Sequence, residues 1–301
     1  MVNLSQARKT KIFNNPELFI EGWYWAIRSR DLKVETIKPV TLLGRELAIY
    51  RDRDGKAAAL DNETRYNARS WPTAEKYGMV WVWTGDTPRQ PLPFVPELEN
   101  DECDAGLASR FVKNCHPNVV TINAIDAQHF NTVHNLPVKI VFAKNPINEN
   151  AIAFSNTTRG GEDSLFLKLI RPLYKNYVTY SMCYWYGSTG TVTVGPDFLH
   201  FHIMFALRLI EGGKTEGQTI LITKKRPSVL GWLFNRLVLW LTKMVGNYFA
   251  KGDTKVFQTI KFDFKTPIAA DKSIIEFIQH FERQKPLTWA TWEECKGEQD
   301  R

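Results

Sequence analysis

The order of two kinds of segment in the second half of the chain constrains the fold most. From 151 to 223 the sequence is dominated by runs of β-branched and aromatic residues, which favour the strands of an antiparallel sheet. The segments 232–249 and 270–284 then have the pattern of helices. A sheet followed by long helices is typical of an α+β fold, and helices packed across a curved sheet commonly leave an apolar cavity between them.

The first third of the chain predicts a smaller β structure. The stretch 21–83 contains short strand-like runs joined by turns, including an Asp-Gly hairpin signal within 53–55. A proline-rich stretch, 87–96, has the composition of a linker. We therefore expect two domains, 1–90 and 91–301.

The positive charge is concentrated in one part of the chain. In total, 39 Lys and Arg against 32 Asp and Glu give a net charge of +7. The stretch 224–265 contains nine Lys or Arg and two Asp, so it holds the whole excess. A nucleic-acid-binding protein would spread its basic residues over a broad surface and show a recognisable motif. We therefore expect no nucleic-acid partner and one basic patch.

The basic stretch 224–265 is also rich in Trp, Leu and Phe, which is the chemistry of an amphipathic helix at a membrane interface. No segment of the chain reaches the roughly 18 consecutive apolar residues that a membrane-spanning helix needs. One expectation is therefore a cytoplasmic protein with peripheral membrane contact through 224–265. An ordinary core helix, or a lid over an apolar substrate cavity, explains the same residues.

Two histidines lie close together in the sequence, within a stretch, 118–134, that is mostly consistent with one helix. The spacing Asn-x-x-Asp-x-x-His-x-x-x-x-His places Asn123 and Asp126 before His129 and His134. Neutral imidazoles are good ligands for iron, zinc or copper. Positions five apart on a regular helix diverge by about 140°. Both histidines can therefore bind one ion only if the backbone deviates between them, for example by a π-type turn. Two unrelated histidines on a helix surface are the alternative.

This spacing resembles the mononuclear iron motif of the Rieske-type non-haem iron oxygenases, the alpha subunits of ring-hydroxylating and demethylating enzymes. The resemblance implies that His129 and His134 bind Fe(II), that Asp126 orients His129 and that Asn123 supports the site. Two histidines and one carboxylate form the facial arrangement that leaves coordination positions open for O2 and substrate.

The third ligand of that family is an aspartate at the start of a late helix. Residues 270–279 resemble that segment, so the resemblance implies Asp271 as the third ligand. Asp271 also suits a helix N-cap, which is the alternative role, and Asp263 is the competing carboxylate.

The resemblance extends to the N-terminal part. Residues 21–25, 43–47 and 70–83 are similar to the opening, the next strands and the closing strand pair of the family's Rieske domain. Between these pieces the family has Cys-x-His and Cys-x-x-His, which hold a [2Fe-2S] cluster. Residues 59–67 contain no Cys or His. The resemblance thus implies a truncated Rieske-type β domain followed by a helix-grip (START-like) catalytic domain with a curved antiparallel sheet.

The implied activity is O2-dependent hydroxylation or oxidative demethylation of an aromatic or apolar ring substrate. In the intact family a reductase or ferredoxin supplies electrons, and in a homotrimer they pass from the cluster of one subunit to the iron of the next by way of the residue that matches Asp126. Without cluster ligands we expect no sustained turnover. The alternatives are a non-catalytic helix-grip module that binds an apolar ligand, and a segment lost through a faulty gene model or an engineered deletion.

Two further expectations concern the cavity. His200 and His202 alternate along a probable strand, so they should face the same side, either satisfied by hydrogen bonds or lining the cavity. Six aromatic residues are candidates for the cavity wall, with core packing as the alternative for each: Phe154, Phe166, Tyr180, Tyr184, Trp185 and Phe205.

Overall fold

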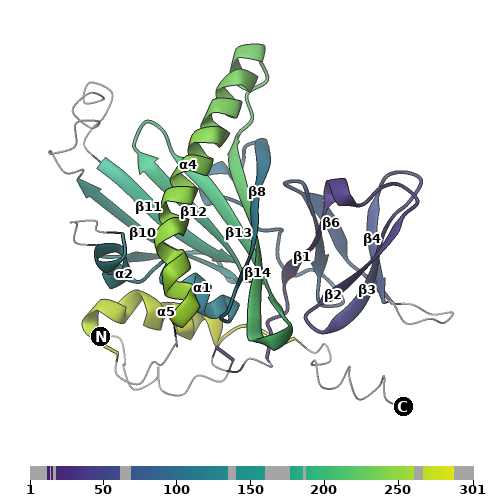
Figure 1. Cartoon of the computed structure of the whole chain (residues 1–301), viewed down its shortest axis with the longest axis horizontal. Helices are drawn as coiled ribbons and strands as arrows, with labels where there is room; N and C mark the ends of the chain where they lie inside the picture. The colour runs from purple at the N-terminus through teal and green to yellow at the C-terminus, as the bar shows by residue number, and fades with distance from the viewer. Residues whose placement is uncertain are drawn as a thin grey trace.

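The computed structural model describes residues 12–13, 15, 18–61, 69–134, 140–159, 177–185, 188–260 and 267–287. It confirms the α+β fold (Figure 1). The larger part is a seven-stranded antiparallel sheet with the strand order β8-β14-β13-β12-β11-β10-β9. Its strands are β8 (Cys103–Lys113), β9 (Ala143–Asn148), β10 (Ala151–Arg159), β11 (Tyr177–Trp185), β12 (Thr189–Pro196), β13 (Phe201–Ile210) and β14 (Lys214–Lys224).

Helices cover one face of this sheet (Figure 1). The long helix α4 (Val229–Thr259) packs on β13, β14 and β8, and it extends well beyond the predicted 232–249. The helix α5 (Lys272–Phe281) packs on β9 and β10. The core between sheet and α5 includes the Tyr184 and Phe277 rings, whose centroids are 4.3 Å apart. A long helix laid across a sheet is the arrangement that the helix-grip expectation describes.

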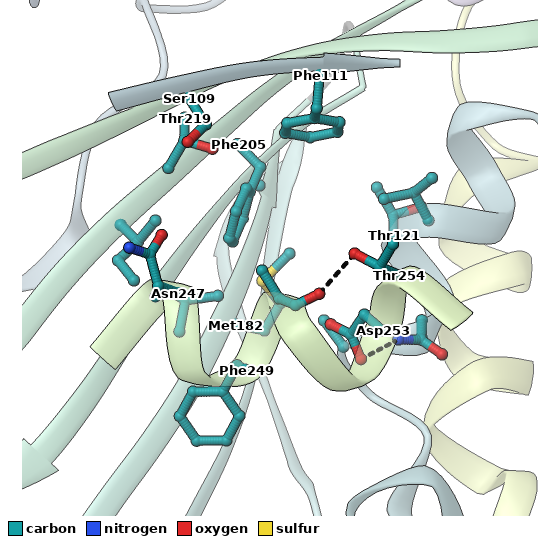
Figure 2. Close-up of a pocket in the computed structure, with 18 of the residues that line it drawn as sticks. Ser109, Phe111, Thr121, Met182, Phe205, Thr219, Asn247, Phe249, Asp253 and Thr254 are labelled. Carbon is teal, nitrogen blue, oxygen red and sulfur yellow. Dashed lines mark hydrogen bonds between the residues drawn. The ribbon is translucent and has the colours of Figure 1, made fainter. Parts of the chain in front are cut away.

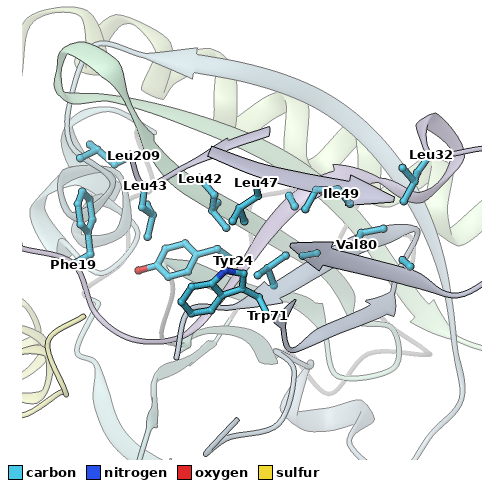
Figure 3. Close-up of a cluster of buried hydrophobic side chains, with 14 residues drawn as sticks. Phe19, Tyr24, Leu32, Leu42, Leu43, Leu47, Ile49, Trp71, Val80 and Leu209 are labelled. Carbon is cyan, nitrogen blue, oxygen red and sulfur yellow. The ribbon is translucent and has the colours of Figure 1, made fainter. Parts of the chain in front are cut away.

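The N-terminal part forms two small antiparallel sheets, β1-β7-β6 and β2-β3-β4-β5. Their strands are β1 (Trp23–Arg28), β2 (Ile37–Leu42), β3 (Arg45–Arg51), β4 (Ala57–Asp61), β5 (Ser70–Trp71), β6 (Thr73–Lys76) and β7 (Met79–Trp83). The predicted Asp-Gly hairpin joins β3 to β4, with Gly55 at φ +81°. Side chains such as Tyr24, Leu47 and Trp71 pack between the two sheets (Figure 3).

The small sheet β1-β7-β6 shares a tryptophan-rich core with the large sheet. In this core Trp25 and Trp81 pack with Met204 of β13 and other buried residues. Arg208 of β13 donates a hydrogen bond to the Ala26 carbonyl oxygen at 3.0 Å, and its guanidinium lies 4.0 Å from the centroid of the Trp25 ring. The two parts are therefore packed on one another, and the division of the chain at residue 90 stays a prediction.

The resemblance to the family implies that the ligands of a [2Fe-2S] cluster would lie between β4 and β5. Residues 62–68 lie outside the described residues. On either side of them, the Asp61 carboxylate accepts hydrogen bonds from Arg45 Nε at 2.8 Å and from Trp71 Nε1 at 2.7 Å. The Arg69 guanidinium lies 4.0 Å from the centroid of the Trp71 ring. These contacts join the ends of the two strands, and none of the described residues that make them is a Cys or His.

Candidate metal centre

The two predicted histidines converge because a helix ends between them. The stretch 118–134 forms two short helices, α1 (Pro117–Asn123) and α2 (Ala127–Thr132), so the expectation of one helix is wrong. His129 lies in α2, whereas His134 lies two residues beyond the end of that helix. Their Nε2 atoms are 3.0 Å apart. The deviation that the spacing requires is thus the end of α2, not a π-type turn.

The third donor beside these imidazoles is Asp253 of α4. Its Oδ1 atom lies 2.8 Å from His129 Nε2 and 3.2 Å from His134 Nε2. The two histidine side chains are only 5% exposed, and that of Asp253 is 24% exposed. Three potential metal ligands therefore meet in a largely water-excluded position.

The three donor atoms fit one metal ion. Ligand atoms about 2.1 Å from an ion lie about 3.0 Å apart when their bonds are at right angles and about 3.4 Å apart in a tetrahedron. The observed separations of 3.0, 2.8 and 3.2 Å match the right-angled, facial arrangement. Two imidazoles and one carboxylate in this arrangement are the ligand set of non-haem Fe(II) oxygenases.

The structure does not bring Asp271 to this cluster. Asp271 ends the short 3-10 helix η6 (Ala269–Asp271), and its Oδ2 atom accepts a hydrogen bond from the Ile268 backbone N–H at 2.8 Å. This hydrogen bond closes the first turn of η6; as the N-cap of α5, the alternative role that the sequence left open, Asp271 makes no side-chain capping hydrogen bond. Asp263 lies outside the described residues. Sequence reasoning missed Asp253. One feature of the sequence could have pointed to it, because it is the only acidic residue in α4.

The other two predicted site residues have different positions. Asn123 is buried at the end of α1, and its Nδ2 atom lies 3.1 Å from His129 Nε2 and 3.4 Å from Asp253 Oδ1. Asp126 caps α2, because its Oδ1 atom accepts hydrogen bonds from the backbone N–H groups of Gln128 and His129 at 2.9 and 3.2 Å. Asn123 thus touches the donor atoms, whereas Asp126 positions the backbone of His129.

Burial sets the protonation of the groups around the cluster. Desolvation lowers the pKa of His134, and the nearby Asp253 carboxylate opposes that shift. A lowered pKa favours the neutral imidazole, which is the form that binds a metal. Burial also raises the pKa of Tyr180, whose hydroxyl donates a hydrogen bond to the Ala124 carbonyl oxygen at 2.8 Å.

The cluster lies in the wall of a pocket between α4 and the sheet. The pocket has a volume of about 310 Å³ and includes His129, His134 and Asp253 in its lining. Figure 2 shows Phe111, Phe205 and Met182 on the sheet side, with Asn247, Phe249 and Asp253 along α4. An apolar ring bound in this pocket would lie beside the three donor atoms.

The predicted cavity aromatics divide into two groups. Tyr180 and Phe205 line the pocket. Phe154 and Tyr184 belong to the core beneath α5, and Trp185 packs against Phe94 with ring centroids 4.4 Å apart. Phe166 lies outside the described residues.

His200 and His202 each have a polar partner near the start of β13. His200 Nδ1 lies 2.8 Å from Glu97 Oε2, and His202 Nδ1 lies 3.0 Å from Thr193 Oγ1. Neither lines the pocket. The hydrogen-bonded alternative therefore holds for His202, whereas His200 Nε2 is buried without a hydrogen-bond partner among the described residues.

Comparisons with known proteins show similarity to an oxidoreductase in sequence and to oxygenases in fold. The chain is 24% identical over 183 residues to cholesterol 7-desaturase of Bombyx mori, an alignment that covers 44% of this chain and 40% of the desaturase. It thus spans about two fifths of the length of that relative. No protein-family model matches the chain.

Two solved structures share the fold. The oxygenase of carbazole 1,9a-dioxygenase, in a fluorene-bound complex with ferredoxin, matches with a TM-score of 0.61 and 13% identity over 94% of this chain and 95% of that one. Dicamba monooxygenase with non-haem iron and dicamba matches with a TM-score of 0.51 and 15% identity over 91% of this chain and 98% of that one.

These relatives confirm the resemblance to the Rieske-type non-haem iron oxygenases, in sequence and in fold. They are oxygenases and a desaturase, so the enzyme class that the chain resembles is that of oxidoreductases. Within the described part of the chain, none of the helices has the length and apolar character to cross a bilayer.

Proposed function

We propose that this chain is the catalytic part of a Rieske-type non-haem iron oxygenase and holds Fe(II) through His129, His134 and Asp253. The implied reaction is O2-dependent hydroxylation or oxidative demethylation of an aromatic or other apolar ring substrate. One observation supports this proposal above the others: three donor atoms, 2.8 to 3.2 Å apart, lie in the wall of an apolar pocket.

Different residues of the chain would have different roles in such a site. Bound Fe(II) would supply O2 activation, because a facial set of three ligands leaves positions open. Asn123 Nδ2 donates a hydrogen bond to Asp253 Oδ1 and would hold this carboxylate in place, while the lone pair of the adjacent His129 Nε2 would go to the metal. Phe111, Phe205 and the neighbouring apolar residues would bind the ring substrate and exclude water from the donor atoms.

We propose further that the chain cannot sustain turnover. Its first 102 residues contain no Cys or His, so they offer no ligand of the kind that a [2Fe-2S] cluster requires. Asp126, the residue that matches the electron bridge of the family, caps α2 through its carboxylate. A ferredoxin or reductase would therefore find no cluster to reduce in the N-terminal part of this chain.

Iron binding tests the first proposal. The purified chain is reconstituted anaerobically with Fe(II), and bound iron is measured per chain. We expect about one iron in the unaltered chain and in Asp271→Ala, and binding at least tenfold weaker in Asp253→Ala, because, of these two aspartates, it is Asp253 that contacts the imidazoles. Equal loss in both variants, or loss only in Asp271→Ala, would contradict the ligand set.

Oxygen consumption tests the second proposal separately. The iron-loaded chain is mixed with ferredoxin, its reductase, NADH and an apolar aromatic compound. We expect no sustained oxygen uptake above that of the Asp253→Ala variant. Continued uptake would overturn the proposal about electron supply and would leave the iron site intact.

The second candidate function is a non-catalytic module that binds an apolar ligand. The pocket favours it, since its apolar lining requires no redox chemistry. Failure of the chain to retain iron, together with binding of an apolar fluorescent dye that Phe205→Asp abolishes, would favour this function.

Three broader expectations stay proposals. They are the division into domains 1–90 and 91–301, a homotrimer of the kind found in the family, and a cytoplasmic location with membrane contact through 224–265. The tryptophan-rich core contains residues of both proposed domains.

A further inference from the structure

We propose that the outer face of α4 docks on an anionic lipid membrane. The α4 face consists of six apolar side chains, each 51 to 78% exposed: Leu230, Leu233, Leu237, Trp240, Met244 and Tyr248. They follow one another at intervals of three or four residues, so they lie on one side of the helix. A surface helix normally presents polar residues on that side.

The opposite side of α4 is buried against the sheet, as is usual for a helix that packs on one. Asn235, Val238 and Thr242 are at most 1% exposed, on the side that packs on the sheet. Figure 1 shows that the first turns of α4 extend past the end of the sheet. Within the described part of the chain, nothing covers the α4 face, and its apolar area requires a partner outside this chain.

Charge identifies the kind of partner. From 224 to 252 the sequence has six Lys or Arg and no Asp or Glu. Two of these cations are neutralised within the chain, since Lys224 pairs with Asp101 at 2.7 Å and Lys225 pairs with Glu102 at 2.9 Å. Arg236, Lys243 and Lys251 form no ion pair with any described residue and are exposed. An anionic partner would therefore complement them.

A membrane suits this combination better than a second copy of the chain. Two copies that paired through the α4 face would bring equal positive charges together, because the one acidic residue of the facing helix, Asp253, lies against His129 and His134. Anionic headgroups would take up the cations while the apolar side chains enter the acyl boundary. The helix is not apolar enough to span the bilayer, so it would lie in the interface.

The same helix connects this surface to the pocket. Gly246, Asn247, Phe249 and Ala250 of α4 line the pocket, each within one turn of Met244 or Tyr248 on the outer face. Docking of this kind holds whether or not the cluster of His129, His134 and Asp253 binds iron.

Vesicle flotation of the full chain tests the proposal. We expect binding to vesicles that contain phosphatidylserine and little binding to pure phosphatidylcholine, with release at high salt. Arg236→Glu should weaken binding roughly five- to thirtyfold, because it removes one favourable charge and adds an unfavourable one. The double variant Leu237→Ser, Trp240→Ser should weaken it at least tenfold.

Matched controls lie on β2, far from α4 in the fold. Ile37 is 69% exposed and Lys38 beside it is exposed. Ile37→Ser removes an exposed apolar side chain and Lys38→Glu reverses an exposed positive charge, as the α4 variants do, but on a different surface. Both should leave vesicle binding unchanged, and all variants should unfold at the temperature of the unaltered chain. Absence of binding to anionic vesicles, or equal loss with Lys38→Glu, would overturn the proposal. So would a dimer in light scattering that the double variant dissociates, since the α4 face would then bind a second copy.

Discussion

Gly252 allows α4 to pass close to His134, and an alanine there should disturb the donor cluster. A Cβ atom at position 252 would lie 3.1 Å from Val133 Cγ1 and 3.3 Å from both Cε1 and Nδ1 of His134. Ordinary contacts of this kind begin at 3.4 Å. Helix and imidazole must therefore separate by a few tenths of an ångström in Gly252→Ala.

This displacement is small for the fold and large for a metal site. Alanine in place of glycine stabilises a helix interior by about 1 kcal/mol, which offsets the crowding. Ligand positions in a metal site tolerate errors of only about 0.2 Å. We therefore expect a free energy of unfolding within about 1 kcal/mol of the unaltered chain and an iron affinity about tenfold lower, equivalent to about 1.4 kcal/mol.

Gly246→Ala is the matched control on the same helix. Its Cβ would meet only Ile203 Cδ1, at 3.1 Å, which is the mobile end of a flexible side chain. Urea unfolding should show a gain of up to about 1 kcal/mol, and competition with a chelator should show unchanged iron affinity. Should Gly252→Ala retain the iron affinity of Gly246→Ala, the close packing of α4 on His134 would not set the ligand geometry.

Two more predictions concern stability, and one concerns the site. Arg208→Met should lower the free energy of unfolding in urea by about 3 kcal/mol, because it leaves the buried Glu216 carboxylate without one of its guanidinium partners; a loss below 1 kcal/mol would argue against a buried ion pair. Burial lowers the pKa of His202 and His280 to about 4, so the unfolded chain takes up protons before the folded chain does. The free energy of unfolding should therefore fall as the pH decreases from about 6.5 to about 4, and His202→Gln should reduce this slope in urea titrations at several pH values. Asn123→Ala should lower iron affinity about tenfold without abolishing it, as measured by chelator competition, and full retention would show that its contacts with His129 and Asp253 are dispensable.

Local patterns in the sequence predicted the parts of the site that depend on neighbours along the chain. The spacing of His129 and His134 indicated a helix that had to deviate, because a continuous helix would point the two rings apart. The structure provides that deviation by ending α2 at Thr132. The sequence did not show where it would occur, since Thr132 is followed directly by Val133 and His134 and not by a glycine or proline that would signal the end of a helix.

The third ligand depended on a contact between distant parts of the chain. Asp253 and His134 are more than a hundred residues apart, and their proximity follows from the way α4 packs across β13 and β14. Asp271 fitted the expected position at the start of a late helix, but a carboxylate at such a position can satisfy backbone N–H groups instead, as it does here.

By itself, the sequence determined the α+β order, the histidine pair, the resemblance to Rieske-type oxygenases and the absence of cluster ligands, because periodicity, spacing and residue identity are local properties. The tertiary structure alone decided that Asp253 is the carboxylate beside the histidines and that the apolar residues of α4 face outward. Both depend on the rotation of one long helix about its axis, and packing against the sheet sets that rotation.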